Sequence, residues 1–151
     1  MKKLLDVGCG PGTIGNVGLY ETLKKDYAIY GIDFIKSNIR SIKNRFPQGK
    51  FSQADAISLP FDDNYFDAIF ARHIFEHVEN PEKVLTEIKR VLKPKSLLTI
   101  AVPHERLEQL LIKILPHNIE IERHHQRIFT EKGLINLLEK KGFTVISCRK
   151  G

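Results

Sequence analysis

A cluster of glycines follows the first apolar run of the chain, in the stretch LLDVGCGPGTIG at residues 4–15. Glycine adopts positive φ angles in tight turns, and a ligand can approach its backbone closely because there is no Cβ in the way. The apolar run before the cluster and the helical stretch after it place these glycines between a strand and the N-terminus of a helix. The stretch therefore predicts a loop whose exposed main chain binds a ligand.

The nature of this ligand is narrowed by the residues that follow. Residues 10–15, GPGTIG, match the dinucleotide-binding pattern GxGxxG, and Asp33 lies 18 residues past Gly15 at the end of a second apolar run. A carboxylate in that place can accept hydrogen bonds from ribose hydroxyls. The absence of GKS or GKT after the glycines excludes a nucleoside-triphosphate loop. The residues alone leave NAD and other adenosine-containing ligands open.

A second candidate site lies at residues 73–77, where HIFEH matches the HxxEH zinc motif of some proteases. In that motif two histidines one helical turn apart bind zinc, and the glutamate activates water. Here the residues directly follow an apolar run and precede a helix start at Asn80 and Pro81, so we expect a loop with a short helical turn. We therefore expect no zinc site, and no other metal site.

The elements that must position these residues alternate between short apolar runs and helical periods. We expect strands at 3–7, 28–33, 50–53, 66–71, 96–102 and 143–148. We expect helices at 13–25, 36–46 and 104–115, one from Pro81 to the stop at Pro94, and one from the cap Thr130 to Lys141. This alternation predicts an α/β fold with a doubly wound, mostly parallel sheet, and ligands bind such sheets beyond the carboxyl ends of the strands.

Composition and charge narrow the class of protein to which the chain can belong. The 151 residues are 42% hydrophobic, which is enough for one domain over residues 1–151. No apolar run reaches the roughly 18 residues of a membrane span, and the MKKLL opening lacks a signal-peptide pattern, so we expect a cytoplasmic protein. The net charge is +6, but basic and acidic residues are interspersed, which favours a solvated surface over a nucleic-acid partner. Cys9 and Cys148 are expected to be free thiols.

Four stretches in order resemble class I S-adenosylmethionine (SAM)-dependent methyltransferases, in particular those of ubiquinone biosynthesis that act on small molecules. LLDVGCGPG resembles the first motif of that family, and its Asp6 is a residue that dinucleotide loops usually lack. FSQADAISLPF at 51–61 resembles the third-strand motif, and residues 66–94 resemble the fourth strand and the following helix. Residues 125–146 resemble the late helix and strand.

The resemblance implies SAM as cofactor, with S-adenosylhomocysteine (SAH) as product, and it implies a set of contacts. Asp6 and the glycine loop would hold the methionine end, Asp33 the ribose and Asp55 the adenine. The residues implied to contact the cofactor are Asp6, Gly8, Cys9, Gly10, Gly12, Asp33, Phe34, Asp55, Ala56, Arg72 and His77. Each carboxylate also has a structural alternative, because Asp6 can brace the loop, Asp33 can cap the next helix and Asp55 can stabilise a turn.

The methyl acceptor is the open part of this reading. The resemblance offers His125 as the candidate catalytic residue, able to take a proton from an acceptor hydroxyl, with a loop histidine as the alternative. The chain has almost no N-terminal extension, so we expect residues 104–127 to form a lid over a small or lipid-like acceptor. Similar proteins have a further antiparallel strand after the one at 143–148, so we expect a shortened sheet, an edge covered in a homodimer, or a sequence that is part of a longer protein. A methyltransferase-like binding module without turnover and an NAD-dependent oxidoreductase remain as alternative functions.

Overall fold

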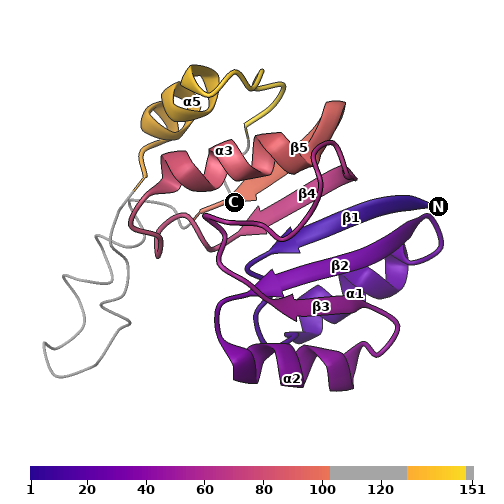
Figure 1. Cartoon of the computed structure of the whole chain (residues 1–151). Coiled ribbons are helices and arrows are strands. Elements are labelled where there is room, and N and C mark those ends of the chain that lie inside the picture. Colours follow the sequence, from indigo (N-terminus) through magenta and orange to yellow (C-terminus); the bar gives the residue numbers. More distant parts are fainter. Residues whose placement is uncertain (103–128, 149–151) are drawn as a thin grey trace, which may run out of the picture.

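A computed structural model describes residues 1–102 and 129–148 of the chain, and its centre is a five-stranded sheet (Figure 1). The strands are β1 (Lys2–Val7), β2 (Tyr27–Asp33), β3 (Lys50–Gln53), β4 (Phe66–Arg72) and β5 (Leu92–Ala101). They lie in the order β3-β2-β1-β4-β5, and every neighbouring pair is parallel. The chain therefore starts in the middle of the sheet and winds outward in both directions, which confirms the predicted doubly wound α/β fold.

Within residues 1–102 and 129–148 there are four helices, and side chains cap three of them at the N-terminus. The helices are α1 (Ile14–Leu23), α2 (Lys36–Arg45), α3 (Pro81–Val91) and α5 (Glu131–Lys140). The Thr13 hydroxyl accepts a hydrogen bond from the third residue of α1, while Asn80 and Thr130 cap α3 and α5 in the same way. The predicted caps Asn80 and Thr130 are confirmed, because each satisfies a backbone N–H that the first helical turn leaves unpaired.

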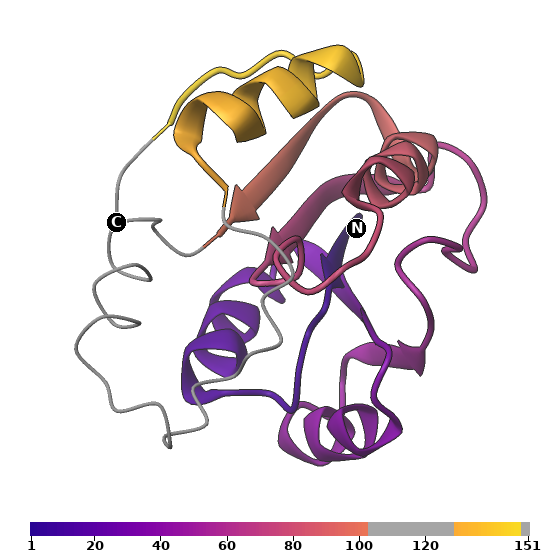
Figure 2. The same ribbon diagram turned by 90° about the vertical axis from the view of Figure 1, so that its left-hand side faces the viewer.

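The helices cover both faces of the sheet. Figure 2 looks at the carboxyl ends of the strands and shows α1 and α3 on opposite sides. Helices α1 and α2 bury Tyr20, Ile42 and Phe46 against one face, and α3 buries its apolar stripe, including Leu85 and Ile88, against the other. Leu137 and Leu138 of α5 pack against the apolar cluster that contains this stripe of α3. The carboxyl edge between these layers is where a ligand of this fold binds.

Strand β5 begins earlier than the sequence indicates. Helix α3 ends at Val91 and the strand starts at once with Leu92, so the expected helical continuation to Pro94 is wrong. Phe66 pairs with Leu92, but Ala68 pairs with Leu97, so β5 bulges between these pairs. Pro94 has no N–H to donate to a ladder, and a bulge accommodates it without losing a pairing bond.

The predicted strand at 143–148 is also wrong, because these residues belong to none of the described strands. Gly142, with φ of 78°, ends α5, and the N–H of Phe143 donates to the Leu138 carbonyl at 3.0 Å. This is the hydrogen-bond pattern of a Schellman cap, so the first residue of the expected strand is used to close the helix. Beyond it, Ile146 is 80% exposed instead of buried on a sheet.

Other expectations lie outside the described residues. They are the helix at 104–115, the lid at 104–127 and the candidate catalytic residue His125. Within the part of the chain that the structure describes, each helix is too short or too polar to cross a bilayer.

Candidate functional site

The glycine loop turns over the carboxyl end of the sheet, as predicted. Gly8, Gly10 and Gly12 have φ angles of 76°, 62° and 79°, in the region that residues with a Cβ rarely adopt. The N–H groups of Gly8 and Cys9 both donate to the Ile32 carbonyl at 2.9 Å, which ties the loop to the end of β2. The loop therefore needs glycine at three positions for its backbone conformation, and the Gly8 and Cys9 bonds hold it against the sheet.

The three glycines face different surroundings. A Cβ on Gly8 would lie 3.2 Å from Ile74, and one on Gly12 would overlap Ile42 and lie 3.3 Å from Arg45 on α2. A Cβ on Gly10 would meet nothing within 4 Å. Gly8 and Gly12 are thus needed for packing against the protein itself, whereas the backbone of Gly10 borders open space that a ligand can enter.

Asp33 joins the glycine loop to the start of α2. Its Oδ2 accepts a hydrogen bond from the Gly10 N–H at 2.9 Å, and its Oδ1 accepts from the Ile35 N–H at 2.8 Å and from the Asn38 amide at 3.0 Å. The structural alternative considered for Asp33 was a cap of the next helix. Asp33 instead contacts the chain just before α2, because the N-cap position is Ile35 and no side chain caps that helix. A carboxylate has about four acceptor positions, so capacity for ribose hydroxyls remains. The neighbouring Phe34 side chain is 71% exposed.

Asp6 lies at the centre of a buried polar network. Its Oδ2 accepts hydrogen bonds from the Tyr20 hydroxyl at 2.5 Å and from Arg72 Nη2 at 3.0 Å. Its other oxygen, Oδ1, and the Nε of Arg72 are both buried and have no hydrogen-bond partner within the described protein. Buried polar atoms are rarely left without partners, so this pair is a candidate for binding an external group.

The electrostatics of this network follow from burial. Desolvation raises the pKa of Asp6, and hydrogen bonds and charge from Tyr20 and Arg72 oppose that rise. Desolvation and the negative charge of Asp6 raise the pKa of the Tyr20 hydroxyl, so it keeps its proton and acts as the donor.

Tyr20 is a site residue that the sequence does not reveal. It is the buried position of α1, two turns beyond the Thr13 cap, on a helix whose other side chains give no clear apolar stripe. A single aromatic residue on such a helix was the only signal. Its contact with Asp6 depends on how α1 lies on the sheet, which no local pattern specifies.

Cys9 is part of the glycine loop, and its side chain is 0% exposed. Burial, followed by the charges of Asp6 and Asp33, raises the pKa of its thiol. Its carbonyl accepts a hydrogen bond from the Asn16 side chain at 3.1 Å. The side chain of Cys9 is therefore part of the core, and any contact with a cofactor would involve the backbone.

The loop after β3 carries the two residues expected near adenine. Asp55 is exposed, and its Oδ1 accepts from the Ile57 N–H at 3.1 Å, which is the turn alternative named above. Ala56 is buried in the core, and Ile57 is exposed. The assignment of Asp55 and Ala56 to adenine stays a prediction.

Arg90 of α3 pins this loop to the second face of the sheet. It donates to the carbonyls of Leu59 and Phe61 at 2.9 and 2.8 Å, and it pairs with Asp63 and with Glu87, both at 2.8 Å. These bonds to one planar guanidinium give the loop a fixed place relative to β4.

We expect Arg90→Gln to lower the free energy of unfolding by about 1–2 kcal/mol, because two loop carbonyls and two carboxylates lose one shared donor. Urea denaturation followed by circular dichroism measures the change. Arg40→Gln, the same replacement at an exposed position of α2, is the matched control. Equal stability of the two variants would contradict this role of Arg90.

Residues 73–77 form a turn, as expected, with the His77 N–H donating to the Ile74 carbonyl at 3.0 Å. Glu76 is buried, and Nδ1 of His73 lies 3.4 Å from its Oε1. The two histidines of HIFEH therefore do not share a helix face. Within residues 1–102 and 129–148, no group of three His, Cys, Asp or Glu side chains is arranged to hold a metal ion. The turn places His77 after β4, on the same edge as Arg72.

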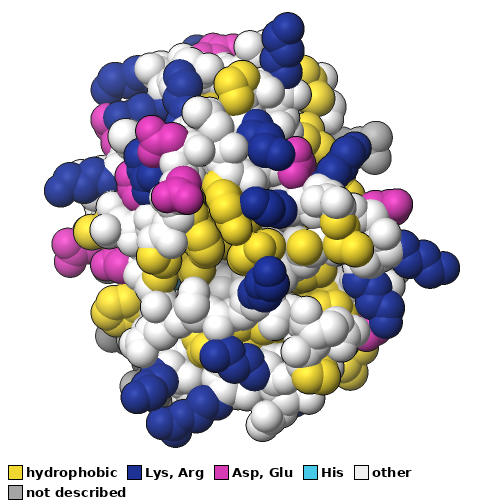
Figure 3. Space-filling view, turned by 45° about the vertical axis from the view of Figure 1, so that its right-hand side comes forward, with side chains coloured by type: hydrophobic (Ala, Val, Ile, Leu, Met, Phe, Trp, Pro, Cys, Tyr) yellow, Lys and Arg dark blue, Asp and Glu magenta, His cyan; other side chains and the backbone are white. Residues whose placement is uncertain are grey.

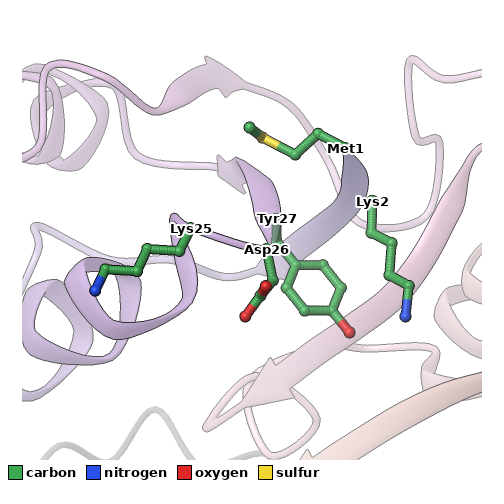
Figure 4. Close-up of a pocket in the computed structure, with 5 residues that line it drawn as sticks. All are labelled: Met1, Lys2, Lys25, Asp26 and Tyr27. Carbon is green, nitrogen blue, oxygen red and sulfur yellow. The ribbon is translucent and has the colours of Figure 1, made fainter.

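A surface hollow of about 630 Å³ lies at the opposite edge of the sheet, at the starts of β1 and β2 (Figure 4). Its lining residues are Met1, Lys2, Lys25, Asp26 and Tyr27. This edge carries the amino ends of the strands, whereas the glycine loop lies at the carboxyl ends. On the face of the molecule in Figure 3, Lys and Arg side chains are spread over the surface, and Asp and Glu side chains stand among those of its upper half.

Comparisons with known proteins agree with this geometry. Residues 5–100 match the family described as a methyltransferase domain. Demethylmenaquinone methyltransferase from Renibacterium salmoninarum is 35% identical over 100 residues, which cover 66% of this chain and 40% of that protein. A sterol 24-C-methyltransferase from Gibberella zeae is 29% identical over an alignment of 157 positions, which covers 95% of this chain and 40% of that protein. The chain thus spans 40% of the length of each of these two relatives.

The fold is also that of solved methyltransferase structures. A protein from Thermotoga maritima described as a SAM-dependent methyltransferase superimposes with a TM-score of 0.77, at 23% identity, over 96% of this chain and 65% of that chain. At this identity the likeness concerns the fold alone. The family match, which includes the glycine loop, Asp33 and Arg72, extends over more than half of the sequence. The chain therefore belongs to the methyltransferase domain family.

Proposed function

We propose that the chain binds SAM across the carboxyl ends of β1, β2 and β4 and transfers its methyl group to a small or lipid-like acceptor. One observation carries the cofactor assignment. A buried acceptor, Asp6 Oδ1, and a buried donor, Arg72 Nε, lack partners beside a glycine loop whose Gly10 borders open space. This pair complements an ammonium and a carboxylate, the two charged groups of an amino acid, and SAM ends in an amino acid.

The same pair argues against NAD as the ligand. A dinucleotide would place its pyrophosphate on the glycine loop, next to the buried Asp6 carboxylate. Two neighbouring negative groups in a buried site repel each other strongly. The residual match of GPGTIG and Asp33 to the dinucleotide pattern does not remove this conflict.

The described residues support the reaction by holding the cofactor. SAM supplies an activated methyl group on its sulfonium. Asp6 and Arg72 would hold the amino acid end, the main chain at Gly10 would lie against it, and Asp33 would accept from the ribose. Fixing the reactants in this way supplies rate by proximity, and a general base is needed only where the acceptor must lose a proton. The assignment of that base to His125 remains a prediction.

The acceptor class is proposed from the relatives. The proteins compared above are named for demethylmenaquinone and for a sterol, which are both largely apolar molecules. The segment 104–127 is the proposed cover for such an acceptor. A homodimer through the β5 edge is a further proposal, because β5 is the last strand on its side of the described sheet.

Calorimetric titration with SAM, SAH and NAD tests the cofactor assignment. We expect SAM and SAH to bind and NAD to give no heat of binding. Binding of NAD in place of SAM would overturn the proposal. Transfer of a labelled methyl group from SAM to a panel of quinones and sterols then tests the activity, and tight SAM binding without transfer to any acceptor would favour the binding-module alternative.

A further inference from the structure

Tyr20 makes a fully buried contact with Asp6, the centre of the polar network described above. Its hydroxyl donates to Asp6 Oδ2 from helix α1. Arg72 of β4 donates to the same oxygen. With Oδ2 bonded twice, the carboxylate cannot rotate without breaking both bonds, and Oδ1 is the oxygen left without a partner.

We propose that Tyr20 is a positioning residue for cofactor binding: its hydroxyl locks the Asp6 carboxylate so that Oδ1 faces the ammonium group of the cofactor's amino acid end. This inference rests on the proposed function. Tyr20 touches no cofactor atom in this role and acts only through Asp6. The Tyr20 bond orients the acceptor oxygen before the cofactor binds. A carboxylate that must reorient on binding gives a weaker interaction.

The tyrosine ring is itself held in place. It packs edge-to-face on Phe46, with ring centroids 5.4 Å apart, and it lies 6.1 Å from the ring of Phe51. These contacts involve the ring and not the hydroxyl. Tyr20→Phe therefore keeps the packing of α1 on α2 and β3 and removes the hydrogen bond to Asp6 alone.

The hydroxyl also favours the charged form of the Asp6 carboxylate over the protonated form. The titratable groups that face Asp6 are Tyr20 from α1, Arg72 from β4, Asp33 from β2 and Cys9 in the loop. Burial raises the pKa of Asp6, and the Tyr20 hydrogen bond is the largest of the effects that lower it. Without that bond the pKa rises further, so as the pH falls Asp6 becomes protonated at a higher pH and no longer attracts an ammonium group.

The test compares two ligands that differ only at the amino acid end. SAH carries that end, and 5′-methylthioadenosine lacks it while keeping the nucleoside and the sulfur. We expect Tyr20→Phe to weaken SAH binding about tenfold and to change 5′-methylthioadenosine binding by less than about twofold. The pH at which SAH binding is lost should move upward in this variant. In an Asp6→Asn background, Tyr20→Phe should cause no further loss.

Tyr30→Phe is the matched control, because the Tyr30 hydroxyl bonds with Lys50 and Tyr65 away from the loop. It should change the binding of neither ligand. Equal weakening of both ligands by Tyr20→Phe, or no weakening of SAH, would overturn the inference. If Tyr20→Phe does not fold, 3-fluorotyrosine at position 20 strengthens the donor, and an unmoved pH limit would overturn the inference. A wild-type protein that binds neither ligand contradicts the proposed function instead.

Discussion

Replacing Asp33 with asparagine is expected to weaken SAH binding about 100-fold, because one side chain would carry the proposed ribose contact and also closes the glycine loop. Asparagine has the same shape but offers an NH₂ group in place of one oxygen. In one orientation that NH₂ faces the Gly10 N–H, and in the other it faces the Ile35 N–H, so two donors meet either way. The free energy of unfolding should fall by about 1–3 kcal/mol for the same reason.

Asp26→Asn is the control for this substitution. Asp26 is exposed in the turn before β2, at the opposite edge of the sheet from the glycine loop, and the chemical change is identical. Calorimetric titration with SAH measures affinity, and thermal unfolding measures stability. Wild-type affinity in Asp33→Asn would show that the carboxylate serves only contacts within the protein, and the proposed ribose contact would then be wrong.

Gly12→Ala is expected to lower stability more than Gly10→Ala does, whereas Gly10→Ala is expected to lower SAH affinity more. Both add a Cβ at positive φ, but at Gly12 that Cβ overlaps Ile42 of α2, while at Gly10 it meets open space. We expect Gly12→Ala to cost about 3 kcal/mol of stability, which corresponds to a fall of about 6–12 °C in Tm for a chain of this length.

Gly10→Ala should cost only about 1–2 kcal/mol of stability, the cost of the backbone conformation itself. Its effect on SAH affinity should be the larger of the two, because the new methyl group would occupy the space left for the ligand. Thermal unfolding and SAH titration of both variants check this order. Gly10→Ala with unchanged affinity would indicate that the cofactor does not lie on this part of the loop.

The features that could be predicted from the sequence are those set by neighbours along the chain. The caps Asn80 and Thr130 act within one turn, and the strand positions follow from short apolar runs between turn residues. The order of the motifs then predicted the doubly wound sheet, because parallel strands require crossover helices. The glycine loop was predicted on the same basis.

The features that could not be predicted depend on contacts between distant elements. Tyr20 and Asp6 are 14 residues apart, and they meet only because α1 lies across β1. The bulge of β5 results from its pairing with β4, and the Schellman cap at Phe143 competes with a strand that the local pattern favours. For Asp33 the sequence offered a ribose contact and a helix cap as alternatives. The hydrogen bond from the Gly10 N–H was not predicted, because it depends on how the loop lies at the end of β2.

The burial of Cys9 makes the glycine loop chemically observable. An alkylating reagent reaches this thiol only when the loop lifts away from the sheet, so the modification rate reports the free energy of that local opening. The exposed thiol of Cys148 reacts without any opening and provides an internal rate standard in the same molecule. A compound that binds to the loop would slow the alkylation of Cys9 and leave that of Cys148 unchanged. The two native thiols therefore report whether the loop is occupied, without any added label.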